Sequence, residues 1–380
     1  MYQSLRLTVV TTIKEFESLR GAWNGLLYNS TSIVIHLTHE WFKSWWESFH
    51  QNNDLRIIII SDHDNQLIAI APFMVTDSSY RGIHIKKICF MSNGHSPFAN
   101  FIIKEDKITE SIKAIFSYLE TFQDWHMIEF RKLNSSDPVY ESVLDYLKES
   151  KCLYGIKRNI ETPFIVIDSD WDTFLRSRST KFRKVLRNKI NRVNKTGDLL
   201  IERIEISGSK DDVLQEMLEV SKNSWKRQIG TDLAGNLDSK CFYMKLCDFL
   251  GPQGIITLWL LRKGGKAIAF EFHLTYNDTV YPIRADYDES FKSLSPGSIL
   301  EFNILKALFE EGKVTEYNSC GHTYDYLLNW TDNTRKHYDI EIFSRHFLPH
   351  SLHTLEYRIL PVLKKLKINK AMHYLKSKKE

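Results

Sequence analysis

The stretch "DYDESFKSLSPGSIL" at residues 286–300 joins a polar, acidic loop to a strongly apolar run through a Ser-Pro-Gly triplet. Beyond the triplet, apolar residues recur at helical spacing as far as Gly312, namely Ile299, Phe302, Ile304, Leu305, Leu308 and Phe309. This periodicity predicts an amphipathic helix that ends at the glycine.

The sequence leaves two starts open for this helix. Ser295 is one N-cap candidate, with Pro296 in the first helical position. Ser298 with Glu301 is the other, as a capping box. In either case the Gly297 backbone is bare, and the free N–H groups of the first turn carry the positive end of the helix dipole. Such a helix start suits an anion such as a pyrophosphate.

Strand-like segments flank the helix, with "TVYPIRADYD" at 279–288 before it and "TEYNSCG" at 315–321 after it. In open α/β sheets a ligand lies at the carboxyl ends of strands, where neighbouring strands diverge. Chemically active side chains follow both strands at that point, and they are Arg284, Asp286, Tyr287, Asp288, Asn318, Cys320 and His322.

The whole chain alternates strand-like and helix-like segments, which predicts a mixed α/β protein with partly antiparallel sheets. At 380 residues, two domains are the expectation. We expect an N-terminal domain over 1–163, a C-terminal domain over 164–346 and a basic amphipathic helix over 347–380. An aromatic helix at 38–50 is interpreted as packing a core rather than lining a ligand groove.

Charge is unevenly distributed although the formal net charge is only +4. Residues 176–195 hold nine basic residues and no acid, and residues 362–380 hold seven lysines and one glutamate. The first block predicts a helix that contacts an anion or simply presents a solvated face. The second either lies on an anionic membrane surface or packs its leucines on the domain.

The five scattered cysteines lack CxxC spacing, so neither a disulfide framework nor a metal site is expected. No apolar run approaches the length of a membrane span. We expect a cytoplasmic protein, with peripheral contact at the inner face of the membrane as one role for the C-terminal lysines.

A family resemblance rests on an ordered set of short motifs in the second half of the chain. They are "SWKRQIG" (224–230), "KAIAFEFHL" (266–274), "ADYDESFKSLSPGSIL" (285–300), "LFEEGKVTEYNSCG" (308–321) and "YLLNW" (326–330). Together with "HLTHEWFKSWWESF" and the basic block, this set resembles the BioF2-like, CelD-related acetyltransferases. That group belongs to the GNAT superfamily and is kin to the FemAB peptidoglycan aminoacyltransferases.

The resemblance implies two tandem GNAT-like domains, the second binding acetyl-CoA or another acyl-CoA as co-substrate. The amides of Ser295, Gly297, Ser298 and Ile299 would then hold the CoA pyrophosphate. The implied reaction is acyl transfer to a sugar or amino-sugar in polysaccharide biosynthesis. One alternative is a FemAB-type transferase that uses aminoacyl-tRNA. Because Phe182 is the only aromatic residue in the basic helix, nucleic-acid binding is the less favoured reading. The other alternative is that the protein is a non-catalytic, membrane-associated scaffold.

Direct acyl transfer needs a base for the acceptor proton. Asp288, Asp286 and His322 are the candidates, although the aspartates could instead cap the loop. Substrate contacts are expected from Arg284, Trp225, Lys226 and Tyr287. For Arg284 the open alternative is an ion pair with Asp286, and for Trp225 and Lys226 it is packing on the domain surface.

Two further residues bear on the acceptor side. Cys320 could act as a nucleophile, but a small buried strand residue is the favoured interpretation. Leu327 follows Tyr326 where the family often places a lysine, a departure that concerns the acceptor more than the CoA.

Overall fold

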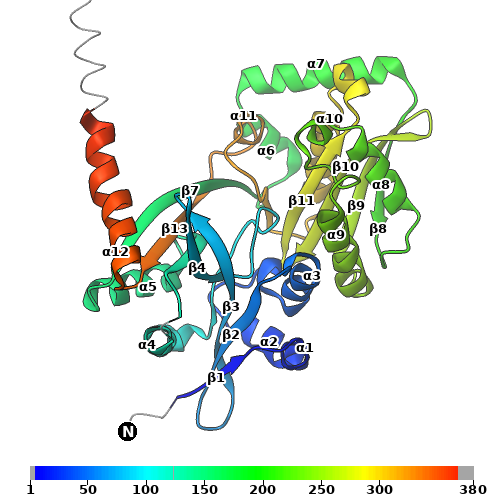
Figure 1. The fold of residues 1–380 in the computed structure, drawn as a ribbon. Helices are drawn as coiled ribbons and strands as arrows, with labels where there is room; N and C mark the ends of the chain where they lie inside the picture. The colour runs from blue at the N-terminus through cyan, green and yellow to red at the C-terminus, as the bar shows by residue number, and fades with distance from the viewer. Residues whose placement is uncertain (1–4, 123, 367–380) are drawn as a thin grey trace, which may run out of the picture.

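The computed structural model describes residues 5–122 and 124–366 (Figure 1). Within those residues, thirteen strands join into one mixed sheet with helices on both faces. The mixed α/β class predicted from the sequence is confirmed.

The strands of the first half are β1 (Arg6–Val10), β2 (Asp54–Ser61), β3 (Leu67–Tyr80), β4 (Ile83–Phe90), β5 (Ile102–Ile103), β6 (Met127–Asn134) and β7 (Leu153–Val166). The second half adds β8 (Leu199–Glu205), β9 (Ile256–Lys263), β10 (Lys266–Tyr276), β11 (Thr279–Tyr287), β12 (Glu316–Asn318) and β13 (Thr334–Phe343).

The helices of the first half are α1 (Ile13–Ser18), α2 (Arg20–Leu27), α3 (His39–Phe49), α4 (Ile108–Thr121) and α5 (Pro138–Glu149). Those of the second half are α6 (Trp171–Ser177), α7 (Thr180–Thr196), α8 (Val213–Lys222), α9 (Leu237–Leu250), α10 (Pro296–Glu311), α11 (Asp325–Leu328) and α12 (Phe347–Thr354).

The sheet runs in the order β1-β2-β3-β4-β6-β13-β7-β12-β11-β10-β9-β8, with β5 on β3. The late strand β13 lies between β6 and β7, so the chain returns to its first half before α12. In Figure 1 the long strand β7 curves from the first half toward the second. The expected boundary at 163/164 falls inside this strand, which belongs to both halves of the sheet.

The two halves also share a core, in which α3 packs on α9. The rings of Trp41 and Phe242 meet edge to face with centroids 5.1 Å apart. Trp41, Trp45 and Trp46 are all buried. The aromatic stripe of residues 38–50 is therefore core, because aromatic side chains at helical spacing bury large apolar areas.

Strands β11 and β12 are parallel neighbours for a very short distance. Their register contains only the pairs Thr279–Glu316 and Val280–Tyr317. Beyond Val280, β11 continues alongside β10 to Tyr287, whereas β12 continues alongside β7 to Asn318. The sheet therefore splits between β11 and β12, at the end from which the chain enters α10.

The C-terminal helix docks on the first half of the sheet. A Cβ on Gly155 would lie 1.9 Å from the Tyr357 ring, so this close approach requires glycine. The Tyr357 hydroxyl donates to Glu341 Oε2 at 2.9 Å. Beyond Tyr357 the chain exposes Ile359, Val362, Leu363 and Leu366. The rest of the helix expected over 347–380 lies outside the described residues from 367 onward.

No helix among the described residues is both long and apolar enough to cross a membrane.

Candidate functional site

The start of α10 lies where β11 and β12 part. Ser295 occupies the N-cap position with φ +54° and ψ +51°, and Pro296 is the first helical residue. The Ser295–Pro296 start is therefore right, but the Ser295 side chain makes no capping hydrogen bond. The capping box is wrong: Ser298 lies inside the helix, and Glu301 is buried at 8% exposure because it faces the core. The first turn thus lacks a side-chain cap of its own.

Basic side chains from α7 reach this uncapped turn. Lys189 Nζ donates to Ser298 Oγ at 2.9 Å, and Arg192 Nη1 donates to the Ser293 carbonyl at 3.0 Å. In Figure 1, α7 passes across the end of the second half where α10 begins. The helix dipole and the two basic side chains therefore both place positive charge at this turn, which favours the binding of an anion.

The described residues leave space open beside Gly297. A Cβ on Gly297 would meet only Tyr287 Cδ1, at 3.9 Å. The Ile299 amide already donates to the Ser295 carbonyl at 3.2 Å, so binding a ligand would compete with the helix's own bond. The roles predicted for Ser295, Gly297, Ser298 and Ile299 stay predictions, with Gly297 and Ser298 the better placed amides.

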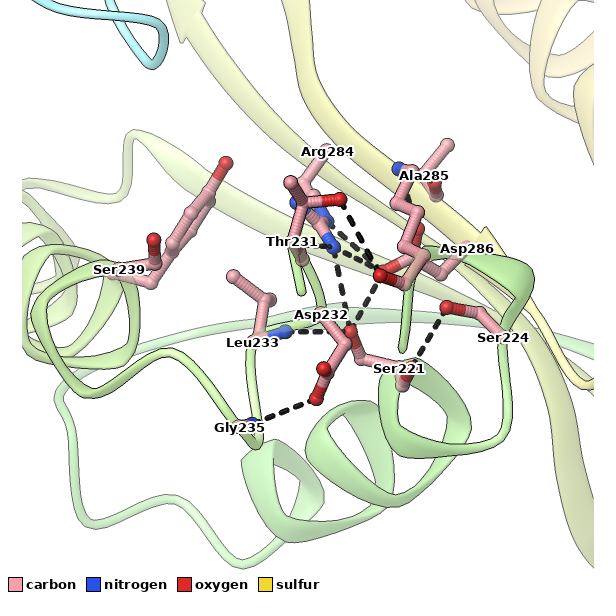
Figure 2. Close-up of polar contacts among 12 residues, drawn as sticks. Ser221, Ser224, Thr231, Asp232, Leu233, Gly235, Ser239, Arg284, Ala285 and Asp286 are labelled. Atoms are coloured by element: carbon pink, nitrogen blue, oxygen red, sulfur yellow. Dashed lines mark hydrogen bonds and ion pairs between the residues drawn. The ribbon is translucent and has the colours of Figure 1, made fainter. Parts of the chain in front are cut away.

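An ion cluster on the opposite face of β11 brings together three of the predicted site residues (Figure 2). The Arg284 side chain lies 2.9 Å from Asp286 Oδ2, and Ser221 Oγ donates to the same oxygen at 2.8 Å. Lys226 Nζ lies 2.5 Å from Asp286 Oδ1. Both carboxylate oxygens are thus engaged, and the Asp286 side chain is fully buried.

Lys226 also marks the open edge of β11. Its Nζ donates to the Ala285 carbonyl at 2.7 Å, well past the last residue that pairs with β12. Burial lowers the Lys226 pKa, and the nearby Arg284 charge lowers it further, while Asp286 opposes the change. Arg284 also donates to the Thr231 carbonyl at 2.8 Å, which ties the loop before α9 to the strand. Asp286 is therefore arranged as the counterion of two cations.

Asp288 caps the next turn. Its Oδ1 accepts from the Ser290 amide at 3.0 Å and from the Ser290 hydroxyl at 2.6 Å, and Lys266 Nζ lies 3.1 Å from Oδ2. The hydrogen bonds from Ser290 and the Lys266 charge together hold the Asp288 pKa below its usual value despite burial. Asp288 therefore caps the loop, which is the alternative considered from the sequence. Its low pKa also makes it a poor general base.

The remaining predicted residues lie at the surface or against the helix start. His322 is exposed, and its ring centroid lies 5.9 Å from that of Tyr324. Trp225 is 45% exposed beside Lys226. Tyr287 is partly buried and packs against the core beside Gly297. Their predicted roles in catalysis and substrate binding stay predictions.

Cys320 is a poor nucleophile in this structure. Burial raises its pKa well above the usual value for a thiol, so the sulfur stays protonated. It lies in the loop after β12 with φ +55° and packs, partly buried, against the core shared by the two halves. The interpretation as a strand residue is therefore wrong, because β12 ends at Asn318.

A second titratable cluster, on the α10 face of the sheet, is not among the residues singled out from the sequence. His273 Nε2 lies 2.9 Å from Glu271 Oε2, and the Tyr317 hydroxyl donates to the same oxygen at 3.4 Å. Tyr317 is the last residue of β12 paired with β11, so the cluster lies beside the split. Burial, followed by the Glu271 charge, raises the pKa of Glu301 to about 8. Glu301 is therefore protonated at neutral pH.

The sequence carried a signal for this cluster. Glu271 and His273 are polar residues two apart within the apolar run "KAIAFEFHL", and that spacing places both on one face of a strand. Glu301 precedes Ile304 and Leu305 by three and four residues, which places it on the apolar stripe. A polar residue at a core position is an indication of function or of a satisfied network.

Comparison with known proteins agrees with this geometry. Residues 180–326 match the model of an acetyltransferase (GNAT) domain, a segment that begins with α7 and ends in α11. The C-terminal half carries a GNAT-type domain. No similar protein was found among curated sequences.

Solved structures resemble the whole chain. FemX shares 10% identity, with a TM-score of 0.59, over 91% of this chain and 100% of FemX. L-PGS from Bacillus licheniformis shares 12% identity, with a TM-score of 0.55, over 90% and 95% of the two chains. A C-terminal domain described as belonging to a putative lysylphosphatidylglycerol synthetase from Agrobacterium fabrum shares 11%, with a TM-score of 0.53, over 91% and 97%. At these identities the likeness shows the fold alone. This likeness agrees with the mixed α/β fold, whereas a GNAT-like N-terminal domain stays a prediction, because the domain match covers residues 180–326.

Proposed function

We propose that this protein transfers an acyl group, most simply acetyl, from acyl-CoA to a sugar or amino-sugar acceptor. One observation carries the proposal: the uncapped start of α10 faces the split between β11 and β12, with Lys189 and Arg192 beside it. This arrangement lies within the segment that matches the GNAT domain.

The residues present fit the phosphate end of such a donor. The amides of Gly297 and Ser298 and the ammonium of Lys189 would hold the pyrophosphate, since helix starts and lysines bind phosphate oxygens well. The open edge of β11 beyond Val280 would accept the pantetheine arm through its backbone groups. When bound, the donor supplies an activated thioester carbonyl.

Proton handling would fall to the Glu271 cluster in this proposal. Glu271 has a histidine and a tyrosine as hydrogen-bonding neighbours, and protonated Glu301 lies close enough to feel its charge. A carboxyl group whose pKa is raised to about 8, as that of Glu301 is, can exchange a proton near neutral pH. Asp286 and Asp288, in contrast, are both engaged as ion-pair partners.

The acceptor class rests on the resemblance of the motifs to the BioF2-like, CelD-related group, some of which act in exopolysaccharide or cellulose synthesis. A place in surface polysaccharide assembly, with acylation of a hydroxyl or an amine, is the corresponding proposal.

The outward face of α7 favours aminoacyl-tRNA as the second candidate donor. Lys181, Lys184 and Arg187 are exposed on this helix, which contains no acidic residue. A basic stripe of this kind attracts nucleic-acid phosphates.

Thermal unfolding with each donor separates the candidates. With acetyl-CoA at about 100 times its Kd, we expect roughly 2.7 kcal/mol of stabilisation, seen as a rise in Tm, and no comparable rise with aminoacylated tRNA. Lys189→Ala should weaken acetyl-CoA binding about tenfold, the equivalent of about 1.4 kcal/mol.

Lys184→Ala is the matched control, because Lys184 is an exposed lysine of the same helix. It should leave acetyl-CoA binding unchanged under the acyl-CoA proposal. If aminoacylated tRNA stabilises the protein and both alanine variants weaken that stabilisation, aminoacyl-tRNA replaces acyl-CoA as the proposed donor. If neither donor stabilises the protein, the hypothesis of a non-catalytic scaffold replaces the acyl-CoA proposal.

A further inference from the structure

A polar cavity of about 240 Å³ lies between the two halves of the chain. Its walls come from the segments 31–37 and 98–100 and from strands β6, β11, β12 and β13. At roughly 30 Å³ for each water molecule in the liquid, this volume has room for a group the size of one sugar.

The cavity begins where β11 and β12 separate. Tyr281 and Asn318 line it, and each follows the last paired residue of its strand, Val280 and Tyr317. A molecule in the cavity would therefore lie at the closed end of the split into which the proposed acyl donor extends.

Lys132 lies at an irregularity of β6 and lines this cavity, together with a smaller one beside it that Ser96 also lines. The register with β13 shifts between Tyr338 and Ile340, and Lys132 has φ +58°. Its own amide donates to Asp339 Oδ1 at 2.9 Å, which holds the bulge in place. Bulges redirect side chains, and a non-glycine residue with positive φ is strained unless its surroundings fix it.

The Lys132 ammonium has no carboxylate partner within ion-pair distance in the described part of the chain. Its Nζ donates to the Ser96 carbonyl at 2.7 Å. The other cation on the wall, Arg335, is neutralised by Glu316 through two contacts of 2.6 and 2.7 Å. Burial keeps His36 and His337 neutral at pH 7 by lowering each pKa, to about 3 and about 4. Among the described residues that form the wall, one positive charge is therefore left uncompensated.

Polar side chains also line the cavity, namely His337, Asn100, Asn134 and Asn318. Asn100 donates through its amide to Asp137 at 2.9 Å, which fixes its position in the wall.

We propose that this cavity is the acceptor pocket and that the acceptor carries an anionic group, held by Lys132, next to hydroxyl groups held by His337 and the asparagines. This inference rests on the proposed function, because the bound molecule is an acceptor only if the protein transfers an acyl group. The anion could be a sugar carboxylate or a sugar phosphate, since both present oxygens that an ammonium and amides recognise.

Titration calorimetry without any acyl donor tests the pocket by itself. We expect glucuronate or glucose 1-phosphate to bind, and neutral glucose to bind at least tenfold more weakly. Whichever anion binds more tightly identifies the source of the charge. Lys132→Met should reduce the anion's affinity at least tenfold, whereas Lys336→Met should not, because Lys336 is an exposed lysine of the adjoining strand.

A measurement on the unaltered protein guards against a misfolded variant. Burial lowers the pKa of Lys132 to about 8, so anion affinity should fall about tenfold per pH unit above pH 8 as the ammonium loses its proton. The charged and titratable groups facing Lys132 are Arg131, Asp339, Cys320, His36, His95 and His337. The histidines are already neutral there, and the Cys320 thiol stays protonated because burial raises its pKa.

The outcomes separate this inference from the proposed function. Equal affinity for glucose and both anions, or anion binding that ignores both pH and Lys132→Met, overturns the pocket. If none of the three sugars binds at millimolar concentration, the proposed pocket is overturned as well. Acetyl-CoA binding by the unaltered protein is measured separately, and its failure would count against the donor site instead.

Discussion

At the scale of single residues, Asp286 neutralises two cations, the buried Arg284 and the half-buried Lys226. Removing its charge leaves both without a counterion in a poorly solvated place. We therefore expect Asp286→Asn to destabilise the protein by about 3–5 kcal/mol in urea unfolding, the usual result of breaking a buried ion pair.

Asp288→Asn is the control for that substitution. Asp288 also contacts a lysine but acts as a cap, so its loss should cost about 1 kcal/mol. If Asp286→Asn unfolds like the wild type and only turnover is lost, Asp286 is the base that the sequence proposed, and the counterion account is wrong.

Glu301 makes stability depend on pH. Its pKa is about 8 when folded, against 4.5 for an ordinary glutamate. Between these values the folded protein keeps a proton that the unfolded chain has lost, so stability falls as pH rises from 5 to 8. Glu301→Gln cannot titrate. We compare the free energy of unfolding of the variant with that of wild type at each pH. This difference should shift in favour of the variant by at least about 1 kcal/mol from pH 5 to pH 8, because moving a pKa by one pH unit on folding corresponds to about 1.4 kcal/mol.

Urea unfolding at the two pH values measures this difference. Glu310→Gln, at an exposed position of the same helix, should show the same change with pH as wild type. A difference between Glu301→Gln and wild type that is the same at pH 5 and pH 8 would contradict a protonated Glu301.

Residue roles were harder to predict than residue positions. The sequence placed Arg284, Asp286 and Lys226 near one site, and the structure joins them in one cluster. It could not show that Ser221, on α8, shares Asp286 with them, because that contact joins residues 65 apart in the chain. Glu301 was considered for a capping box, one of the two starts left open, since Ser-x-x-Glu is also a capping pattern.

At the scale of elements, helices with strong periodicity were predicted closely. The helix predicted within the basic block 176–195 is α7, Thr180–Thr196, and the helix after the Ser-Pro-Gly triplet is α10, Pro296–Glu311. Strands β7 and β13 were not predicted. Both mix polar and apolar residues, and β13 pairs with strands more than 160 residues earlier, a pairing that no local pattern encodes.

The C-terminal helix offers a test at this scale. Its exposed leucines, Leu363 and Leu366, stand beside Lys364 and Lys365. We propose that this face lies on an anionic membrane surface, where burial of apolar side chains and attraction of lysines add together. Leu363→Glu should greatly reduce sedimentation with vesicles of phosphatidylcholine and phosphatidylglycerol in equal amounts.

Val185→Glu is the matched control, because Val185 on α7 is 46% exposed and Leu363 is 48% exposed. Sedimentation that both substitutions reduce alike, or that is absent with wild type, would contradict a membrane role for the C-terminal helix.

At the scale of the whole molecule, the sequence predicted two similar α/β halves, and the structure joins them through one sheet and a shared core. The cavity between them could not have been predicted. Its walls combine residues near 31, 98, 132, 281, 318 and 335, which only the completed sheet brings together. The helix start of the proposed donor site, in contrast, lies within residues 286–300, and for that reason it was visible before the fold was known. The contact of Lys189 with Ser298 joins residues 109 apart and was not.

The central claim is that the start of α10 binds the pyrophosphate of an acyl-CoA. Titration calorimetry of acetyl-CoA against acetyl-pantetheine, which lacks the pyrophosphate, tests this most directly, with Gly297→Val as the variant, since the open space at Gly297 would be filled. We predict that acetyl-CoA binds wild type at least tenfold more tightly than acetyl-pantetheine and that Gly297→Val removes this advantage. Equal affinities in wild type, or an advantage unchanged by Gly297→Val, would contradict the claim.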